Sequence, residues 1–202
     1  MSEALSRRTE RRTRQRAANR NAILEAARRV AAREGAGELS LRAVAGEAGY
    51  APASVYEYFR NRAELVLALA AEDMGSLARA LREAGLARDG GPGVLAAAAK
   101  IALGLMRGSG ALPAAVATLE GGAAPPEAER VFNGRLIAAL TAFAEAAGRV
   151  PKTREEQADV VLAAAAVTGL AVLVRAGRLK TLGFDEDALL DRLDSRFAGP
   201  SP

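Results

Sequence analysis

Residues 40–65 read SLRAVAGEAGYAPASVYEYFRNRAEL, and this stretch decides the fold. Ser40 is a favourable N-cap for a short helix over residues 41–48, and Gly49 is suited to close that helix. A proline then stands in the first turn of a second short helix, residues 52–59, where its missing N–H costs nothing. Two short helices joined by a tight turn, directly after a basic helix, are typical of a helix-turn-helix unit.

The two faces of this helix pair differ in chemistry. Val44 and Val55 are placed to pack into a core shared with the preceding helix. The opposite face of the second helix carries small or polar side chains, and small side chains let a helix approach base edges closely. The hydroxyls of Ser54 and Tyr56 can reach phosphates. An ordinary pair of short helices in an all-α core has the same pattern, so the pattern alone leaves the function open.

The rest of the chain also has helical periodicity. A basic helix with an apolar stripe is expected from about residue 13 to residue 34, before the helix pair. Glycines and prolines separate the later helices, most clearly at residues 89–93. We therefore predict an all-α protein of about nine helices. Its predicted parts are an N-terminal arm over residues 1–12, expected to be flexible, a helix-turn-helix domain over residues 13–62 and a larger helical domain over residues 63–202.

Charge is distributed unevenly along the chain. Residues 1–62 hold 13 arginines and seven acidic residues, whereas residues 63–202 hold 15 basic and 17 acidic residues. We name residues 1–62 the head. A basic head followed by a mildly acidic remainder of the chain indicates a polyanionic partner for the head. The seven arginines of the first twenty residues have two interpretations, a solvated disordered tail or an arm that adds phosphate or minor-groove contacts.

Composition excludes several classes of function. The chain has no cysteine and no histidine, so we expect no disulfide, no metal site and no cofactor. Without a glycine-rich phosphate motif, we also expect no enzyme activity. The longest apolar helix, residues 160–174, is shorter than the roughly 20 residues that span a membrane. We expect it to be a buried helix, and with a polar N-terminus we expect a cytoplasmic protein with no membrane partner.

Residues 13–65 closely resemble the N-terminal domain of the tetracycline-repressor (TetR) family. The most specific part is the run Tyr-x-Tyr-Phe-x-x-Arg-x-x-Leu over residues 56–65, and the stretches 23–27, 40–45 and 48–50 also fit. Tyr50, Ala51 and Ala53 differ from the residues common in that family, so an operator sequence cannot be transferred.

The resemblance implies a homodimeric, ligand-responsive transcription regulator, usually a repressor, that binds palindromic operator DNA. By position, the residues that match phosphate contacts are Ser40, Tyr56, Tyr58 and Arg62. Those that match the surface near the bases are Arg42, Pro52, Ala53 and Ser54. The alternative that we keep is a constitutive architectural DNA-binding protein without a ligand switch.

The larger helical domain is expected to bind the ligand and form the dimer. Apolar residues on the expected inward faces suggest an apolar small-molecule effector, and the candidates for its pocket are Leu67, Met74, Ile101, Leu105, Met106, Phe132, Leu136, Phe143 and Val167. The helix over residues 160–174 is apolar nearly all round, so one face needs a partner besides the chain's own core. With the last helix it predicts a four-helix dimer contact, whose candidates are Val161, Val172, Leu189, Leu190 and Leu193.

Overall fold

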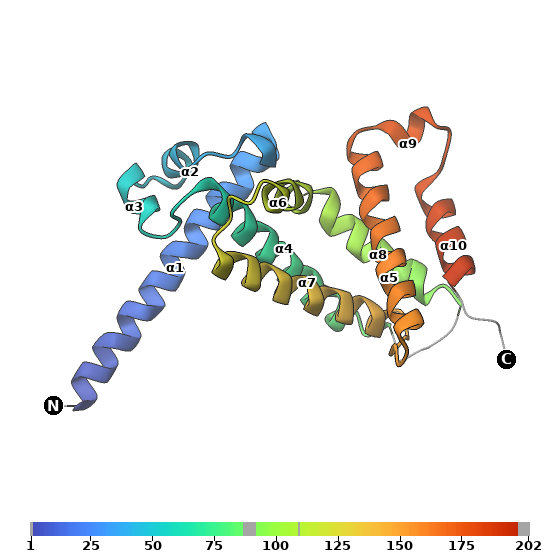
Figure 1. Cartoon of the computed structure of the whole chain (residues 1–202), viewed down its shortest axis with the longest axis horizontal. Coiled ribbons are helices and arrows are strands. Elements are labelled where there is room, and N and C mark those ends of the chain that lie inside the picture. Colours follow the sequence, from blue (N-terminus) through green and yellow to red (C-terminus); the bar gives the residue numbers. More distant parts are fainter. Residues whose placement is uncertain (1, 87–91, 109, 198–202) are drawn as a thin grey trace. The chain divides into compact units, whose positions relative to one another are not determined.

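The computed structural model describes residues 2–86, 92–108 and 110–197, with side chains from residue 6 onward. These residues form ten α-helices and one short 3-10 helix, and no strand occurs among them (Figure 1). The all-α prediction is therefore confirmed. The additional helix is α9 (Arg178–Thr181), a single turn that is too short to leave a periodic pattern in the sequence. Part of the predicted break at residues 89–93 lies outside the described residues.

The chain divides into two compact units, which are described separately. Unit 1 comprises residues 1–69 and 110–129, and unit 2 comprises residues 70–109 and 130–202. The division falls inside α4 (Arg62–Ala84), and α6 (Ala111–Glu120) belongs to unit 1. The domain boundary predicted at residue 62 stays a prediction.

Unit 1 is built on the long helix α1 (Ser2–Glu34). Residue Glu34 is followed by the 3-10 helix η1 (Ala36–Glu38), then α2 (Leu41–Ala48), α3 (Pro52–Tyr56) and the start of α4. Residues at helical spacing on α1 are fully buried, and so are Val44, Val55 and Phe59 of α2, α3 and the turn after α3. α1 packs against α2, and α2 packs against α3. The shared core expected for Val44 and Val55 is thus confirmed.

The structure differs from the expectation for the N-terminal arm. α1 begins at Ser2 and not near residue 13, so the arm is helical and continues the same helix (Figure 1). Arginine, glutamine, alanine and glutamate are good helix formers, and a helix already held by its packed C-terminal half extends at low cost. The side chains of residues 6–18 are all exposed.

Unit 2 contains the C-terminal part of α4 and the remaining helices, which are α5 (Val94–Arg107), α7 (Pro126–Ala146) from residue 130, α8 (Arg154–Arg175), α9 and α10 (Glu186–Phe197). α5 packs against both α8 and α10. Asp194 of α10 accepts hydrogen bonds from the first backbone N–H groups of α5, including that of Leu95 at 3.1 Å. Lys100 and Arg107 of α5 form ion pairs with acids at the start of α10, so the two helices are tied at both ends of their contact.

Helix α8 has one buried and one exposed face. Val160, Ala163, Val167 and Ala171 are buried, and a capping box between Thr153 and Glu156 starts the helix. The opposite face is apolar but exposed, so the chain covers the expected buried helix on one side only. Among the described helices, α8 is long and apolar enough to cross a membrane by length and composition, a test that core helices of soluble proteins also pass.

Candidate nucleic-acid interface

The helix pair α2–α3 is held in one geometry by its caps. The Ser40 hydroxyl accepts a hydrogen bond from Ala43 N at 3.2 Å, which confirms the predicted N-cap. Gly49 has φ 71°, a left-handed conformation that glycine adopts without strain, and Tyr50 N bonds Ala45 O at 2.9 Å. Ala51, at the N-cap of α3, provides no side-chain cap. The turn between the helices is therefore fixed by backbone hydrogen bonds.

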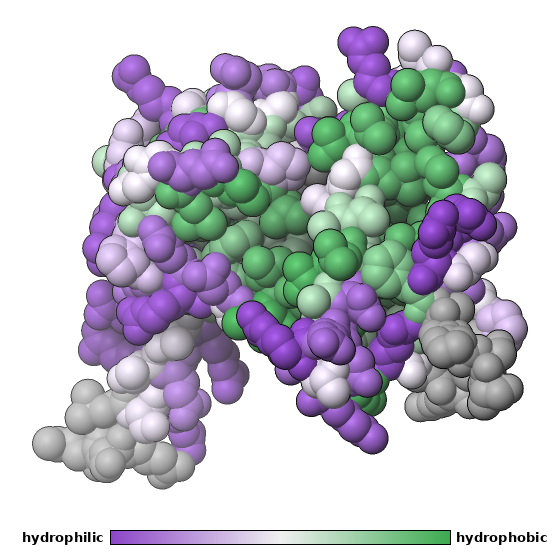
Figure 2. Space-filling view, turned by 45° about the vertical axis from the view of Figure 1, so that its right-hand side comes forward, coloured by the Kyte–Doolittle hydropathy of each residue, from purple (hydrophilic) through white to green (hydrophobic). Residues whose placement is uncertain are grey.

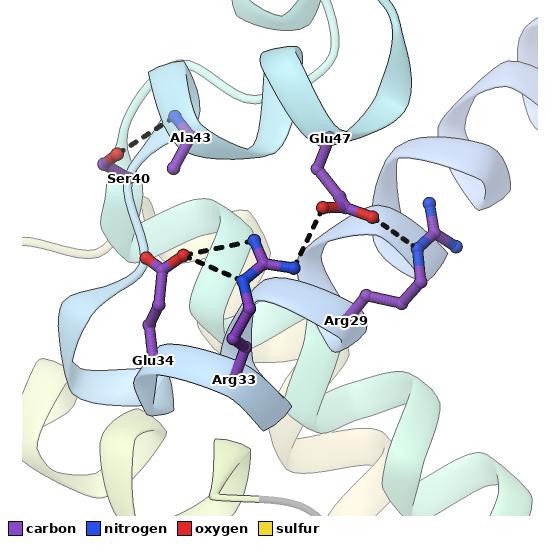
Figure 3. A network of polar contacts seen from close by, with 6 residues as sticks. All are labelled: Arg29, Arg33, Glu34, Ser40, Ala43 and Glu47. Atoms are coloured by element: carbon purple, nitrogen blue, oxygen red, sulfur yellow. Dashed lines mark hydrogen bonds and ion pairs between the residues drawn. The ribbon is translucent and has the colours of Figure 1, made fainter.

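An ion-pair network fastens α2 to α1 (Figure 3). Glu47 of α2 accepts hydrogen bonds from Arg29 at 2.7 Å and from Arg33 at 3.1 Å, and Arg33 also contacts Glu34. The bonds from Arg29 and Arg33 lower the pKa of Glu47 below its ordinary value, and the bonds to Glu47 and Glu34 raise the pKa of Arg33. The network thus keeps these groups charged and holds α2 against α1.

Arg62 fastens the start of α4 to the connection between α1 and α2. Its Nε donates to Leu39 O at 2.9 Å, and its Nη2 donates to Gly37 O at 2.5 Å and Ala36 O at 3.4 Å. These carbonyls lie directly before Ser40, so Arg62 fixes the segment from which α2 starts. Among the described residues, no hydrogen bond uses Arg62 Nη1, and this group stays available for the predicted phosphate contact.

The structure brings most of the predicted DNA-binding residues to the surface of α2, α3 and the turn after α3. Ser40 and Arg42 lie at the start of α2 and are exposed. On α3, Pro52, Ala53 and Tyr56 are exposed and Ser54 is partly buried. Tyr58, in the turn after α3, is also partly buried, and Arg62 is exposed. The exposed start of α3 therefore presents small side chains, as close approach to base edges requires, and Arg42 and Tyr56 are exposed on the same helix pair.

Three residues of α1 also contact these elements and are not among the eight predicted DNA-binding residues, although two of them belong to the arginines of the first twenty residues. Asn19 donates to the Tyr58 hydroxyl at 3.1 Å, and Arg16 donates to Glu57 O at 3.1 Å. The guanidinium of Arg16 lies 5.3 Å from the centre of the Tyr58 ring, and that of Arg20 lies 5.1 Å from the Phe59 ring. The spacing of these residues, three and four apart on one helix face, was the signal available in the sequence.

The predicted ligand-pocket residues are divided between the units. Leu67 belongs to unit 1, and the other eight belong to unit 2. Met74, Phe132, Phe143 and Val167 are buried, but Leu105 is 44% exposed, so its assignment to an inward face is wrong. A cavity of about 10 Å³ in unit 2 is lined by Phe143 among others, and it has room for about one water molecule.

The predicted dimer-contact residues differ in their exposure to solvent. Val161 and Val172 of α8 are exposed, and Leu189 and Leu193 of α10 are partly buried. Leu190 is only 2% exposed in the single chain. It is therefore a core residue of unit 2, and assigning it to a contact with another subunit was wrong.

Comparison with known proteins agrees with this geometry. Residues 23–69 match the family model described as bacterial regulatory proteins, tetR family. No curated protein matches the sequence.

Solved structures match almost the whole chain at low sequence identity. A TetR transcriptional regulator from Rhodococcus sp. RHA1 has a TM-score of 0.68 and 18% identity, with 93% of this chain and 100% of that chain covered. The transcriptional regulator FadR from Bacillus subtilis, solved in complex with stearoyl-CoA, has a TM-score of 0.60 and 19% identity, with 90% and 98% covered. The multidrug binding protein EbrR, complexed with ethidium, has a TM-score of 0.56 and 17% identity, with 89% and 98% covered. These likenesses establish the fold.

Proposed function

Since residues 23–69 form an N-terminal domain of the tetR family of bacterial regulatory proteins, we propose that this chain is a ligand-responsive transcriptional repressor. It binds palindromic operator DNA as a homodimer in the cytoplasm and releases that DNA when an apolar small molecule binds the larger helical domain. The proposal has three parts, which rest on different observations.

DNA reading rests on the helix pair α2–α3. The observation that carries it is the exposed surface of Arg42, Pro52, Ala53 and Tyr56, on two helices that caps and ion pairs hold rigidly. Preorganisation of this kind lowers the cost of binding because fewer groups must be ordered on the DNA. Arg42 can form two hydrogen bonds with a guanine in the major groove, and the small residues at the start of α3 allow that approach.

The homodimer is supported by the exposed face of α8. Unit 2 shows a broad apolar area in Figure 2, and the exposed large apolar side chains on α8 and after α9 are Val161, Leu162, Val172, Leu173, Leu182 and Phe184. Between the two ends of the α8 stripe lie the small exposed residues Ala165, Ala166 and Gly169. A Cβ on Gly169 would meet nothing within 4 Å in its own chain.

An exposed apolar stripe of this length is unusual for a monomer and marks a contact site. The chain's own packing does not require a glycine at position 169, whereas a second helix crossing there would benefit from the close approach that small residues allow. A second copy of α8 supplies a matching stripe through a two-fold axis.

The ligand switch is supported by the fold neighbours and by the composition of unit 2. FadR was solved with stearoyl-CoA and EbrR with ethidium, so proteins of this fold hold large, partly apolar molecules. Met74, Phe132 and Val167 provide buried apolar surface for such a ligand in unit 2. Binding would change the affinity for DNA only if the ligand favours one of two arrangements of the dimer.

The experiment that tests the function is selection from a library of random DNA duplexes by the full chain, followed by sequencing. The expected result is an enriched inverted repeat whose half-sites are about one helical turn, or a multiple of it, apart. A library that stays random after several rounds would contradict the proposal. Lipophilic compounds that raise the melting temperature of the protein should then release the selected duplex.

One observation favours a second candidate, a constitutive DNA-binding protein. The described cavity in unit 2 has room for about one water molecule, far less than an effector needs. If every compound that stabilises the protein leaves its affinity for the selected duplex unchanged, this second function replaces the first.

A further inference from the structure

The N-terminal half of α1 carries two rows of arginines on different faces. Arg8, Arg12, Arg16 and Arg20 recur every four residues, and we name this row the arginine ladder. Arg7, Arg11 and Arg14 form the second row, which we name the opposite row. At 3.6 residues per turn, each step of four residues turns by about 40°, so the ladder winds by about 120° from Arg8 to Arg20, and Arg7 and Arg11 each lie about 100° from the ladder residue that follows them. The two rows therefore point in different directions.

The C-terminal end of the arginine ladder contacts the turn after α3. Arg16 donates to Glu57 O at 3.1 Å and lies over the ring of Tyr58, while Arg20 lies over the ring of Phe59. The ladder thus starts at the turn after α3. Arg8 and Arg12 continue the row toward the N-terminus of α1. This N-terminal part of α1 projects beyond α2 and α3 (Figure 1).

The acidic residue of this segment lies on the other side of the helix. Glu10 lies within 3.9 Å of Arg14 of the opposite row and accepts a hydrogen bond from Ser6. Among the positions that flank the ladder, Thr9 and Thr13 are uncharged and Arg11, three residues after Arg8, is basic. The ladder face therefore carries positive charge alone, and in the described residues Arg8 and Arg12 make no hydrogen bond or ion pair.

We propose that Arg8 and Arg12 of the arginine ladder bind the phosphate backbone of double-stranded DNA beside the half-site that α3 reads. The inference deepens the proposed function, on which it rests. Like charges four residues apart destabilise an isolated helix, and contact with phosphates removes this repulsion. A membrane surface fits less well, because residues 6–20 contain no apolar residue larger than alanine and a helix bound to lipid needs a large apolar face.

The test compares two double variants of the full chain. Arg8→Gln with Arg12→Gln removes two charges from the ladder, and Arg7→Gln with Arg11→Gln removes two charges at the same spacing from the opposite row. Glutamine keeps the helix propensity of arginine, and circular dichroism checks that the helix is retained. Dissociation constants are measured between about 50 and 200 mM salt, on a duplex selected by the wild type and on a duplex of random sequence.

The ladder variant should reduce the log–log salt slope by about 1.8 on both duplexes, at about 0.9 per lost phosphate contact. The variant of the opposite row should keep a slope close to that of the wild type. An unchanged slope for the ladder variant, or equal reductions for the two variants, would overturn the proposal. An unchanged slope together with loss of binding to vesicles of anionic phospholipid would assign the ladder to a membrane instead.

The outcome also separates this inference from the proposed function. If the wild type shows no sequence preference but the ladder variant alone lowers the slope on random DNA, the repressor function fails and the ladder contact stands. If sequence preference is strong and neither variant changes the slope, the ladder contact fails and the repressor function stands.

Discussion

Replacing Arg62 tests whether one side chain both holds the head together and contacts DNA. Its guanidinium donates to Ala36, Gly37 and Leu39 carbonyls through Nε and Nη2, and Nη1 is left for a phosphate. Hydrogen bonds from a charged group to neutral acceptors contribute about 1.5–3 kcal/mol each when well formed, and these are only partly buried. We therefore expect Arg62→Ala to lower the free energy of unfolding by about 1–3 kcal/mol in total.

Arg62→Lys separates the two roles. Lysine keeps the positive charge for a phosphate but cannot present the planar set of donors that spans three carbonyls. Both variants should therefore lose stability in urea unfolding followed by circular dichroism. Only Arg62→Ala should also lower the salt slope of DNA binding, by about 0.9. A lysine variant as stable as the wild type would refute the carbonyl contacts as a stabilising feature, and an unchanged slope in the alanine variant would refute the phosphate contact.

The remaining predictions concern the head and the dimer. Bonds from arginines lower the pKa of Glu47, so its stabilisation is present above the ordinary pKa of 4.5 and is lost as the pH falls below that value. Thermal unfolding between about pH 6 and pH 3 should show this loss in the wild type and less of it in Glu47→Gln, and identical profiles would contradict it. Arg42→Ala should reduce the difference in binding free energy between the selected duplex and a mismatched duplex by about 1–3 kcal/mol, as competition titrations would measure. The variant should stay folded. Val172→Glu and Gly169→Leu should give folded monomers in sedimentation, because both positions are exposed in the single chain. Leu190→Glu should instead lower the melting temperature of the chain itself, since Leu190 is buried within it, and a well-folded monomer from this variant would show that assignment to be mistaken.

Local signals in the sequence predicted the helix-turn-helix head well. Capping is decided within a few residues, so Ser40 and Gly49 could be assigned before any fold was known. The apolar spacing of Val44 and Val55 also identified the shared core, because both residues are fully buried.

Features that depend on distant partners could not be predicted in this way. Periodicity shows that Leu105 and Leu190 belong to apolar stripes, but it does not show which neighbour covers each position. Periodicity therefore could not show that Leu105 is exposed and that Leu190 is buried within the chain. The hydrogen bonds of Arg62 run to carbonyls 23 to 26 positions away, and no local pattern reports them.

The boundaries of α1 show a further limit. Arginine-rich sequence is compatible with both a helix and a solvated coil, and composition alone led to the prediction of a flexible N-terminal arm. Continuity with a packed helix favours the helical state, and this depends on the tertiary structure of unit 1.

The central claim is that the surface of α2 and α3 reads a DNA sequence. The most direct measurement is the ratio of dissociation constants of the wild type for the selected duplex and for a scrambled duplex of identical composition, at one fixed salt concentration. The account predicts at least about 10³-fold tighter binding to the selected duplex, the range of specific regulators. A ratio near one would contradict it, because the basic head would then bind DNA by charge alone.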